Sequence, residues 1–96
     1  MISELQKEII INTIMPFHPV QIGIFGSVAR GESTENSDID ILYRLKDAVG
    51  LFNLVRIKDR LEEKLNRKVD LVSEKYVHPT LKPYIMNDLI IIYTSE

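Results

Sequence analysis

The chain has 96 residues, a length typical of one compact domain, which we assign to residues 1–96. Its 12 Lys and Arg against 14 Asp and Glu give a formal charge of −2, which argues against a free-standing nucleic-acid-binding protein because Lys and Arg supply most phosphate contacts. The absence of Cys excludes a disulfide scaffold and a thiolate zinc site. The first residues are acidic, and no apolar run approaches about 18 residues, so we expect no signal peptide, no membrane span and a cytoplasmic location.

The first part of the chain predicts a helix over residues 3–15. Ser3 and Gln6 have the spacing of a capping box, and the two prolines after the helix are expected to end it. The residues expected on its buried face are Leu5, Ile9 and Ile14. The next predicted segments are a short buried strand over 20–25, one helical turn over 27–30 and a polar turn over 32–37.

The remainder of the chain alternates strands and helices. A strictly alternating strand over 38–45 places Ile39, Ile41, Tyr43 and Leu45 on one face and Asp38, Asp40, Leu42 and Arg44 on the other. The clearest helix covers 51–65, with a stripe made of Leu51, Leu54, Val55, Lys58, Leu61 and Leu65. A strand over 68–72, a short helix over 80–88 and a strand over 89–94, apolar enough to be buried on both faces, complete the pattern. The order predicts an α/β or α+β sandwich on a small sheet.

Three acidic residues lie in predicted strands, where Asp is rare. Asp38 and Asp40 open the second strand, and Asp70 belongs to the third. Alternate positions of a strand point the same way, ~7 Å apart, and two carboxylates at that distance repel by ~2 kcal/mol at an effective dielectric near 20. A divalent cation reverses this sign, and oxygen-only ligands suit Mg²⁺ or Mn²⁺. A pair of ions ~3.5–4 Å apart would stabilise the attacking and leaving oxygens of a phosphoryl displacement.

A glycine-serine turn precedes these acids. Gly26 permits a positive φ and close approach of the backbone, and Ser27 offers a hydroxyl and an N–H at the start of a helical turn, which favours an anion. Two other phosphate motifs are absent, because Glu32 stands where Walker A requires Lys, and the dinucleotide fingerprint lacks its third glycine. The sequence therefore indicates a metal-carboxylate site with a short phosphate-binding turn.

A plainer interpretation of the acids is also open. Asp38 and Asp40 would lie on a solvated strand face, and Asp70 would be an unrelated surface residue. Leu42 shares the face of the first two acids, so that face is not simply polar. Together with the upstream turn, this favours a functional site over scattered surface charges.

Other polar residues have two interpretations each. Arg30 would contact a phosphate, or instead pair with Glu32 or Glu35 at the surface. Arg67 and Lys68 would attract substrate, although a solvated cationic turn is the simpler interpretation. His18 and His78 are assigned to loops rather than to a ligand role, and Tyr43 to the core. Three tyrosines would stack on adenine or meet a partner, although packing in the core or at its rim is the simpler interpretation: Tyr76, Tyr84 and Tyr93.

The segments GSVARG at 26–31 and SDIDIL at 37–42 carry a family resemblance. Ten residues separate Gly26-Ser27 from the D-x-D, and in this the chain resembles the polymerase-β-like nucleotidyltransferases, whose pattern is G-S-x₁₀-D-x-D. The A-R-G and S-D details and the short length resemble the minimal nucleotidyltransferase (MNT) domains in particular. The resemblance extends from the first predicted helix to the last strand.

That resemblance implies a small mixed sheet with helices packed on it, and a nucleotide-transfer site. Asp38 and Asp40 would ligate Mg²⁺, with two ions expected, and Asp70 would be the third carboxylate, which activates the attacking hydroxyl. The residues implied to hold the β- and γ-phosphates of the nucleotide are Gly26 and Ser27. MNT domains are commonly paired with a HEPN-domain toxin, and characterised members are antitoxins that transfer AMP from ATP to a tyrosine of the toxin, releasing pyrophosphate.

Three hypotheses follow. The chain is an Mg²⁺-dependent protein adenylyltransferase acting as an antitoxin, or a non-catalytic antitoxin that neutralises its partner by binding, or an enzyme that transfers a nucleotide to a small molecule such as an aminoglycoside or to an RNA end. All three acidic positions are filled, which favours an active enzyme. Self-association through the last helix and strand is conceivable, but no residue pattern supports a homo-oligomer.

Overall fold

The computed structural model describes residues 2–32, 34 and 36–95. Its elements are α1 (Glu4–Ile14), the 3₁₀ turn η1 (Met15–Phe17), β1 (Pro19–Phe25), α2 (Gly26–Arg30), β2 (Ile39–Leu45), α3 (Leu51–Leu65), β3 (Val69–Ser73), the 3₁₀ turn η2 (Glu74–Tyr76), α4 (Lys82–Asp88) and β4 (Ile90–Thr94). Every predicted helix and strand is present, with small shifts at the ends, and the two 3₁₀ turns were not predicted. Within the described residues, no helix is both long and apolar enough to cross a bilayer.

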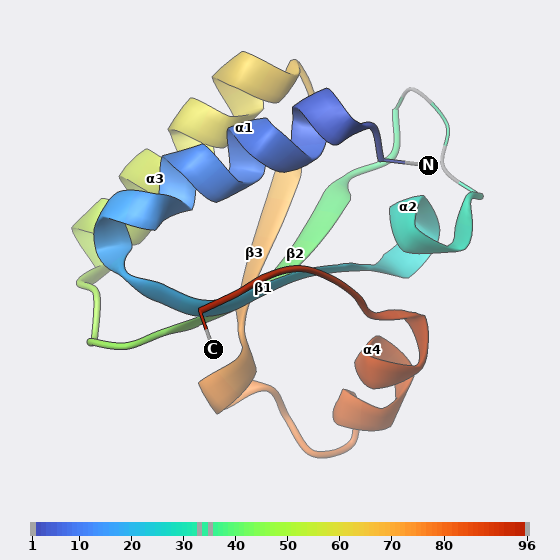
Figure 1. Cartoon of the computed structure of the whole chain (residues 1–96). Helices are drawn as coiled ribbons and strands as arrows, with labels where there is room; N and C mark the ends of the chain where they lie inside the picture. Colours follow the sequence, from blue (N-terminus) through green and yellow to red (C-terminus); the bar gives the residue numbers. More distant parts are fainter. Residues whose placement is uncertain (1, 33, 35, 96) are drawn as a thin grey trace.

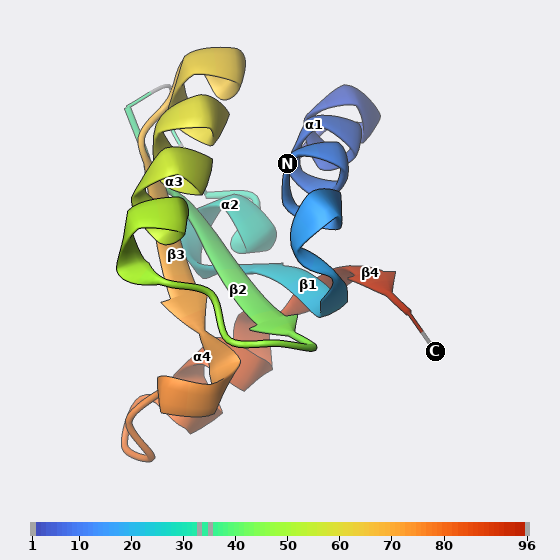
Figure 2. The ribbon, with the colours of Figure 1, turned by 90° about the vertical axis from the view of Figure 1, so that its left-hand side faces the viewer.

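The four strands form one mixed sheet in the order β3-β2-β1-β4. β1 pairs antiparallel with both β2 and β4, whereas β2 and β3 run parallel. A parallel pair needs a crossover connection, and α3 provides it. α1 and α3 lie side by side over one face of the sheet, while α4 lies on the other side (Figures 1 and 2). The predicted α/β sandwich on a small mixed sheet is confirmed.

The main hydrophobic core fills the space between the sheet and the pair α1 and α3. Its buried residues are Ile10, Ile14, Ile22, Ile24, Val28, Ile39, Ile41, Ile57, Leu61, Leu65 and Val69. Ile39 and Ile41 belong to it as the alternation of β2 predicts. Leu42 is also buried but lies outside this cluster. The odd and even positions of β2 therefore face opposite sides of the sheet, and Asp40 is on the side away from the core.

The start of α1 matches its sequence signal closely. The Ser3 hydroxyl accepts a hydrogen bond from the Gln6 N–H at 3.1 Å, and the Gln6 side chain accepts one from the Ser3 N–H at 2.8 Å. This reciprocal pair is the capping box, which satisfies two backbone donors that a helix start leaves open. The helix ends at Ile14, directly before η1 and its proline.

The predicted apolar stripes of α1 and α3 are partly wrong. Leu5 is 66% exposed rather than buried, and Leu51 at the start of α3 is 77% exposed. Val55 is exposed as well, whereas Ile57, which the stripe omitted, is buried with Leu61. The spacing of apolar residues in α3 is compatible with two overlapping buried faces. The packing of α3 against α1 and β3 determines which of the two faces is buried.

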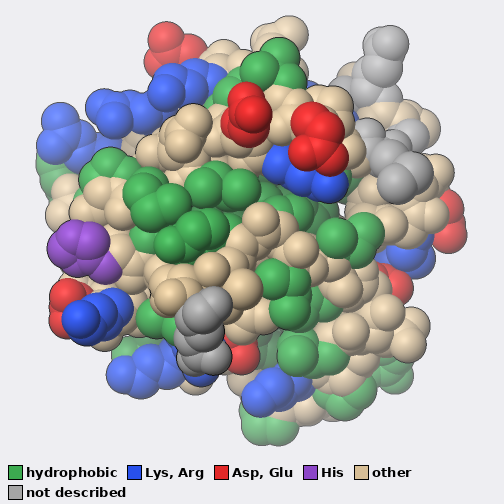
Figure 3. Space-filling model, viewed as in Figure 1, with side chains coloured by type: hydrophobic (Ala, Val, Ile, Leu, Met, Phe, Trp, Pro, Cys, Tyr) green, Lys and Arg blue, Asp and Glu red, His purple; other side chains and the backbone are tan. Residues whose placement is uncertain are grey.

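The prediction for the last strand is also wrong in one respect. β4 is an edge strand, bonded only to β1 in the sheet order, so it is not buried on both faces. Ile90 and Ile91 are exposed, while Ile92 and Tyr93 pack partly against the core. Figure 3 shows apolar side chains gathered where α1 passes along this edge of the sheet. Uniform hydrophobicity signals burial, but it does not distinguish a central strand from an edge strand.

Candidate active site

The turn between β1 and α2 lies directly against the start of β2. Gly26 begins α2 with a φ of +76°, a conformation that favours glycine. A Cβ atom on Gly26 would collide with Oδ2 of Asp40. Phe25, the last residue of β1, is the antiparallel partner of Asp40 in the sheet. The structure therefore brings the predicted phosphate-binding turn and one predicted carboxylate into contact.

A second carboxylate stands beside the first. Asp40 and Asp70 are register partners on the parallel strands β2 and β3. Neighbouring strands lie about 4.8 Å apart, and paired residues point to the same side of a sheet. Because Asp40 points away from the core, Asp70 does too. Asp38 is exposed and directly precedes β2, two positions before Asp40.

The electrostatics show that these carboxylates share one environment. Burial raises the pKa of Asp40 above its ordinary value, and the negative charges of Asp70 and then Asp38 raise it further. The positive charge of Arg30 acts in the opposite direction on the pKa of Asp40. Two neighbouring acids therefore repel the charge of Asp40, and the charge of Arg30 offsets this repulsion only in part.

The donor set fits a hard divalent cation that shares its coordination with a nucleotide. Mg²⁺ is usually bound by one or two carboxylates and completes its shell with water and substrate phosphates. Among the described residues, no group of three or more His, Cys, Asp or Glu side chains is arranged so that it could hold a metal ion by itself. The assignment of Asp38, Asp40 and Asp70 as metal ligands therefore stays a prediction, supported by the repulsion at Asp40 that a cation would relieve.

Arg30 takes part in ion pairs at the end of α2. Its Nη1 donates to Oδ2 of Asp88 at 2.6 Å, and its Nε lies 3.5 Å from Glu32. The pairing with Glu32 is one of the predicted alternatives, while Glu35, the other, lies outside the described residues. The hydrogen bond to Asp88 raises the pKa of Arg30. Sequence reasoning did not identify Asp88 as a partner of Arg30, because the two residues lie 58 positions apart. The local signal was limited to an acid at the end of the last predicted helix.

Arg67 has a structural role that its sequence position did not reveal. It donates to the carbonyl of Ser37 through Nη2 at 2.6 Å and Nε at 3.2 Å, and to the carbonyl of Thr34 at 3.1 Å. These bonds attach Arg67 to Ser37, the residue directly before Asp38. Arg67 is therefore partly buried and bonded to the backbone next to the start of β2, rather than free in solvent. Lys68 contributes its backbone, since its carbonyl accepts a bond from the N–H of Ile39 at 2.9 Å.

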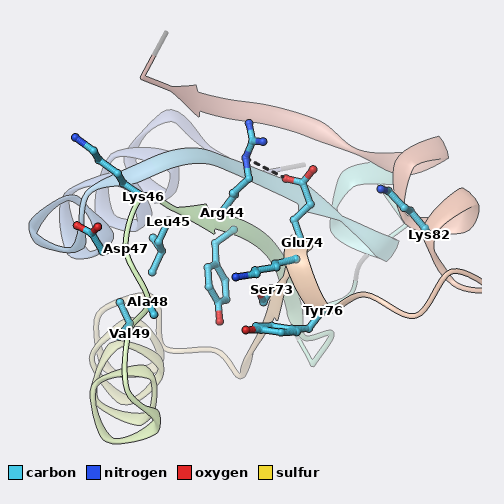
Figure 4. Close-up of a pocket in the computed structure, with 12 residues that line it drawn as sticks. Arg44, Leu45, Lys46, Asp47, Ala48, Val49, Ser73, Glu74, Tyr76 and Lys82 are labelled. Atoms are coloured by element: carbon cyan, nitrogen blue, oxygen red, sulfur yellow. Dashed lines mark ion pairs between the residues drawn. The ribbon is translucent and has the colours of Figure 1, made fainter.

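Two cavities border β2 or the segment before it, and only one of them includes a predicted site residue. One of about 570 Å³ is bordered by Asp38, Arg67 and Lys68. Another of about 510 Å³ opens at the far end of β2 and β3, and none of the predicted site residues lines it (Figure 4). Its lining includes Tyr76 and an Arg44–Glu74 ion pair at 3.8 Å.

The other candidates occupy the following places. His18 and His78 are exposed outside the strands and α-helices, and the ring of His78 bonds the backbone and hydroxyl of Thr80, so both predictions are confirmed. Tyr43 is half-buried, and burial raises its pKa. Tyr93 packs at the rim of the core. Tyr76 and Tyr84 are instead 78% and 73% exposed, so the packing prediction is wrong for these two.

Comparisons with known proteins identify the family of this chain. The family model described as "Nucleotidyltransferase domain" matches residues 6–92. A Methanocaldococcus jannaschii relative named "Putative protein adenylyltransferase MJ0435" is 42% identical over 90 residues, which cover 93% of this chain and 95% of that protein.

Two solved structures extend the comparison. One described as a "putative minimal nucleotidyltransferase" superposes with a TM-score of 0.78 at 34% identity, over 90% of this chain and 88% of that one. A chain of the complex of "tri-AMPylated Shewanella oneidensis HEPN toxin" with "MNT antitoxin" superposes with a TM-score of 0.79 over 98% of this chain and 74% of that one; at 20% identity this likeness concerns the fold. With the family model covering most of its length and a site built on a Gly-Ser turn and paired carboxylates, the chain belongs to the nucleotidyltransferase domain family.

Proposed function

We propose that this nucleotidyltransferase is an Mg²⁺-dependent protein adenylyltransferase that transfers AMP from ATP to a tyrosine of a HEPN-domain toxin and so neutralises it. The observation that carries the proposal is the contact between the turn at Gly26 and the carboxylate of Asp40, with Asp70 as the register partner of that carboxylate. A triphosphate held by the turn would place its phosphates beside the acids. The name of the Methanocaldococcus jannaschii relative supports transfer to a protein. The AMPylated HEPN toxin in the Shewanella oneidensis complex supports the class of partner.

Each residue of the site has a role in this chemistry. Gly26 and Ser27 would bind the β- and γ-phosphates through backbone N–H groups and the serine hydroxyl. Mg²⁺ bound by Asp38 and Asp40 would supply charge neutralisation for the phosphates. The site would then act mainly through positioning and electrostatic stabilisation.

The transfer itself is a displacement at phosphorus. The phenol oxygen of the acceptor tyrosine forms a bond to the α-phosphorus, the bond from that phosphorus to the bridging oxygen breaks, and pyrophosphate leaves. A tyrosine hydroxyl has a pKa of about 10, so a base is needed near neutral pH. Asp70 would accept this proton. The register pairing of Asp70 with Asp40 supports this role, because phosphates bound near Asp40 would lie close to Asp70.

Intact-mass spectrometry tests the proposal directly. The cognate HEPN protein is incubated with this chain, ATP and Mg²⁺, and its mass is expected to rise by one AMP residue or a multiple of it. Asp38→Asn and Asp40→Asn are each expected to abolish the gain. Asp59→Asn is the matched control and should transfer normally, because Asp59 is an exposed acid on α3, which lies over the opposite face of the sheet (Figure 2).

The other outcomes separate the competing functions. A stable complex without any mass gain would overturn catalysis and favour neutralisation by binding. The absence of both a complex and a mass gain would overturn the proposal that the acceptor is a protein. Transfer to aminoglycosides or to RNA ends would then be assayed with labelled ATP.

A further inference from the structure

Arg30 and Asp88 join two elements that are far apart in the sequence. Nη1 of Arg30 lies 2.6 Å from Oδ2 of Asp88, which is short even for a charge-assisted hydrogen bond. The side chain of Asp88 is 17% exposed, whereas that of Glu32, the other acid near Arg30, is 66% exposed and lies farther away. Water therefore screens the Asp88 contact less. The pair fastens α2, which begins at the phosphate-binding turn, to the end of α4.

Asp88 is itself held in place by its neighbour in the chain. Leu89 packs over Gly23 of β1 so closely that a Cβ atom on Gly23 would collide with the leucine side chain. The carbonyl oxygen of Ile90 would lie 3.3 Å from that same atom. The corner between α4 and β4 is thus seated on β1, the strand that leads to Gly26 (Figure 1). The backbone next to Asp88 is therefore held against β1 by this packing.

Among the described residues, the bonds of Arg30 leave part of its guanidinium unused. Arg carries five N–H donors in a planar fork, and its ion pairs with described residues use Nη1 and Nε. Arg30 lies on the same five-residue helix as Gly26, where an added Cβ atom would meet the carboxylate of Asp40. Arg30 is therefore bound to the acid of α4 and belongs to the helix that begins at the candidate site.

We propose that Asp88 is a positioning residue for nucleotide binding: it holds Arg30 in the orientation in which the remaining guanidinium donors meet the phosphates of a nucleoside triphosphate. The inference rests on the proposed function, because it requires the Gly26 turn to bind that triphosphate. A helix of five residues has little stability of its own, so α2 depends on such contacts. Without Asp88, the long side chain of Arg30 must be ordered at each binding event.

The test is isothermal titration of the purified chain with ATP in the presence of Mg²⁺. Asp88→Asn is expected to weaken binding about tenfold, equivalent to about 1.4 kcal/mol. Asp88→Glu keeps the charge and is expected to restore most of the affinity. Glu32→Gln, which removes the weaker and more exposed contact of the same arginine, is the matched control and should change affinity less than Asp88→Asn does.

Two further readouts separate positioning from a general loss of structure. Arg30→Ala and the double variant Arg30→Ala with Asp88→Asn are expected to bind ATP equally weakly, because Asp88 acts only through Arg30. In the transfer assay, Asp88→Asn is expected to raise KM for ATP and leave kcat nearly unchanged. Additive losses in the double variant would overturn the inference.

The outcomes also distinguish this inference from the function on which it rests. If the unaltered chain binds ATP and Asp88→Asn binds it equally well, the positioning role is refuted and the proposed function stands. If the unaltered chain binds no ATP with Mg²⁺, both are refuted. If Asp88→Asn fails to fold, the conservative Asp88→Glu variant provides the test. If Asp88→Glu keeps the melting temperature of the unaltered chain but does not recover its affinity for ATP, the role of the Asp88 charge is contradicted.

Discussion

Gly26 and Asp40 lie so close together that a Cβ atom on Gly26 would overlap with the carboxylate of Asp40. This relationship ties the glycine of the turn to the acid of the next strand in a way that neither motif explains alone. The glycine is required for two independent reasons, since its φ of +76° also disfavours other residues.

Gly26→Ala is therefore expected to destabilise the chain by about 1–3 kcal/mol, the usual cost of a strained backbone position, and to abolish ATP binding. The measurement is a thermal melt combined with ATP titration. Gly50→Ala is the matched control, because nothing lies within 4 Å of a Cβ atom there and its φ is −65°. Equal effects of the two substitutions would contradict the close packing of Gly26 on Asp40.

Asp40→Asn is expected to stabilise the chain in the absence of divalent cations while abolishing transfer. The pKa of Asp40 is raised in the folded state by burial and by Asp70 and Asp38. The ionised group therefore destabilises the fold at pH values above its folded pKa, and the penalty disappears as the pH falls through that pKa toward the unfolded value. A gain of about 0.5 kcal/mol would raise Tm by about 2–4 °C in a domain of this size.

The check is a series of melts in a chelating buffer. The Tm difference between Asp40→Asn and the unaltered chain should be positive at pH 7 and shrink as the pH approaches 4. Added Mg²⁺ should raise the Tm of the unaltered chain more than that of the variant. A lower Tm for the variant at pH 7 would show that the local charge repulsion is not the dominant effect.

Asp70→Asn is expected to separate binding from chemistry. Nucleotide affinity should be largely retained because the turn and the other two acids remain, whereas the transfer rate should fall by roughly 10²–10⁴-fold if Asp70 is the general base. Single-turnover measurement of AMP transfer, with ATP titration in parallel, makes the comparison. A loss of affinity equal to the loss of rate would assign Asp70 to metal binding instead.

Leu61→Ala and Leu51→Ala, two leucines on α3, are expected to differ sharply in stability. Leu61 is fully buried, and removing such a side chain costs about 2–5 kcal/mol. Leu51 is 77% exposed, and its replacement should change stability by less than about 0.5 kcal/mol. Urea titration of both variants measures the difference, and similar values would contradict the observed orientation of α3.

The sequence predicted the parts of the site that depend on local spacing. The Gly-Ser turn and the two acids of β2 lie within fifteen consecutive residues, 26–40, so a motif captures them. The Arg30–Asp88 and Arg67–Ser37 contacts span 58 and 30 positions, and only the sheet order brings those residues together. No local pattern reports such pairs.

The errors in the fold have the same physical origin. Leu51 and Ile57 both fit a helical apolar period, and only packing against α1 and β3 decides which of them is buried. The run from Ile90 to Ile92 has the hydrophobicity of a central strand, yet the register with β1 leaves it at the edge. The hydrophobic pattern of a segment identifies it as a helix or a strand. The elements packed against that helix or strand determine which of its surfaces is buried.

The parallel pairing of β2 and β3 has a consequence for folding. The turn, Asp38 and Asp40 belong to the antiparallel pair β1 and β2, whose segments are close in the sequence. Asp70 comes from β3, which pairs with β2 only through the crossover made by α3. A folding intermediate limited to the hairpin would hold the phosphate turn and two acids without the third. The complete set of three acids therefore depends on the α3 crossover, whose residues Ile57, Leu61 and Leu65 belong to the core.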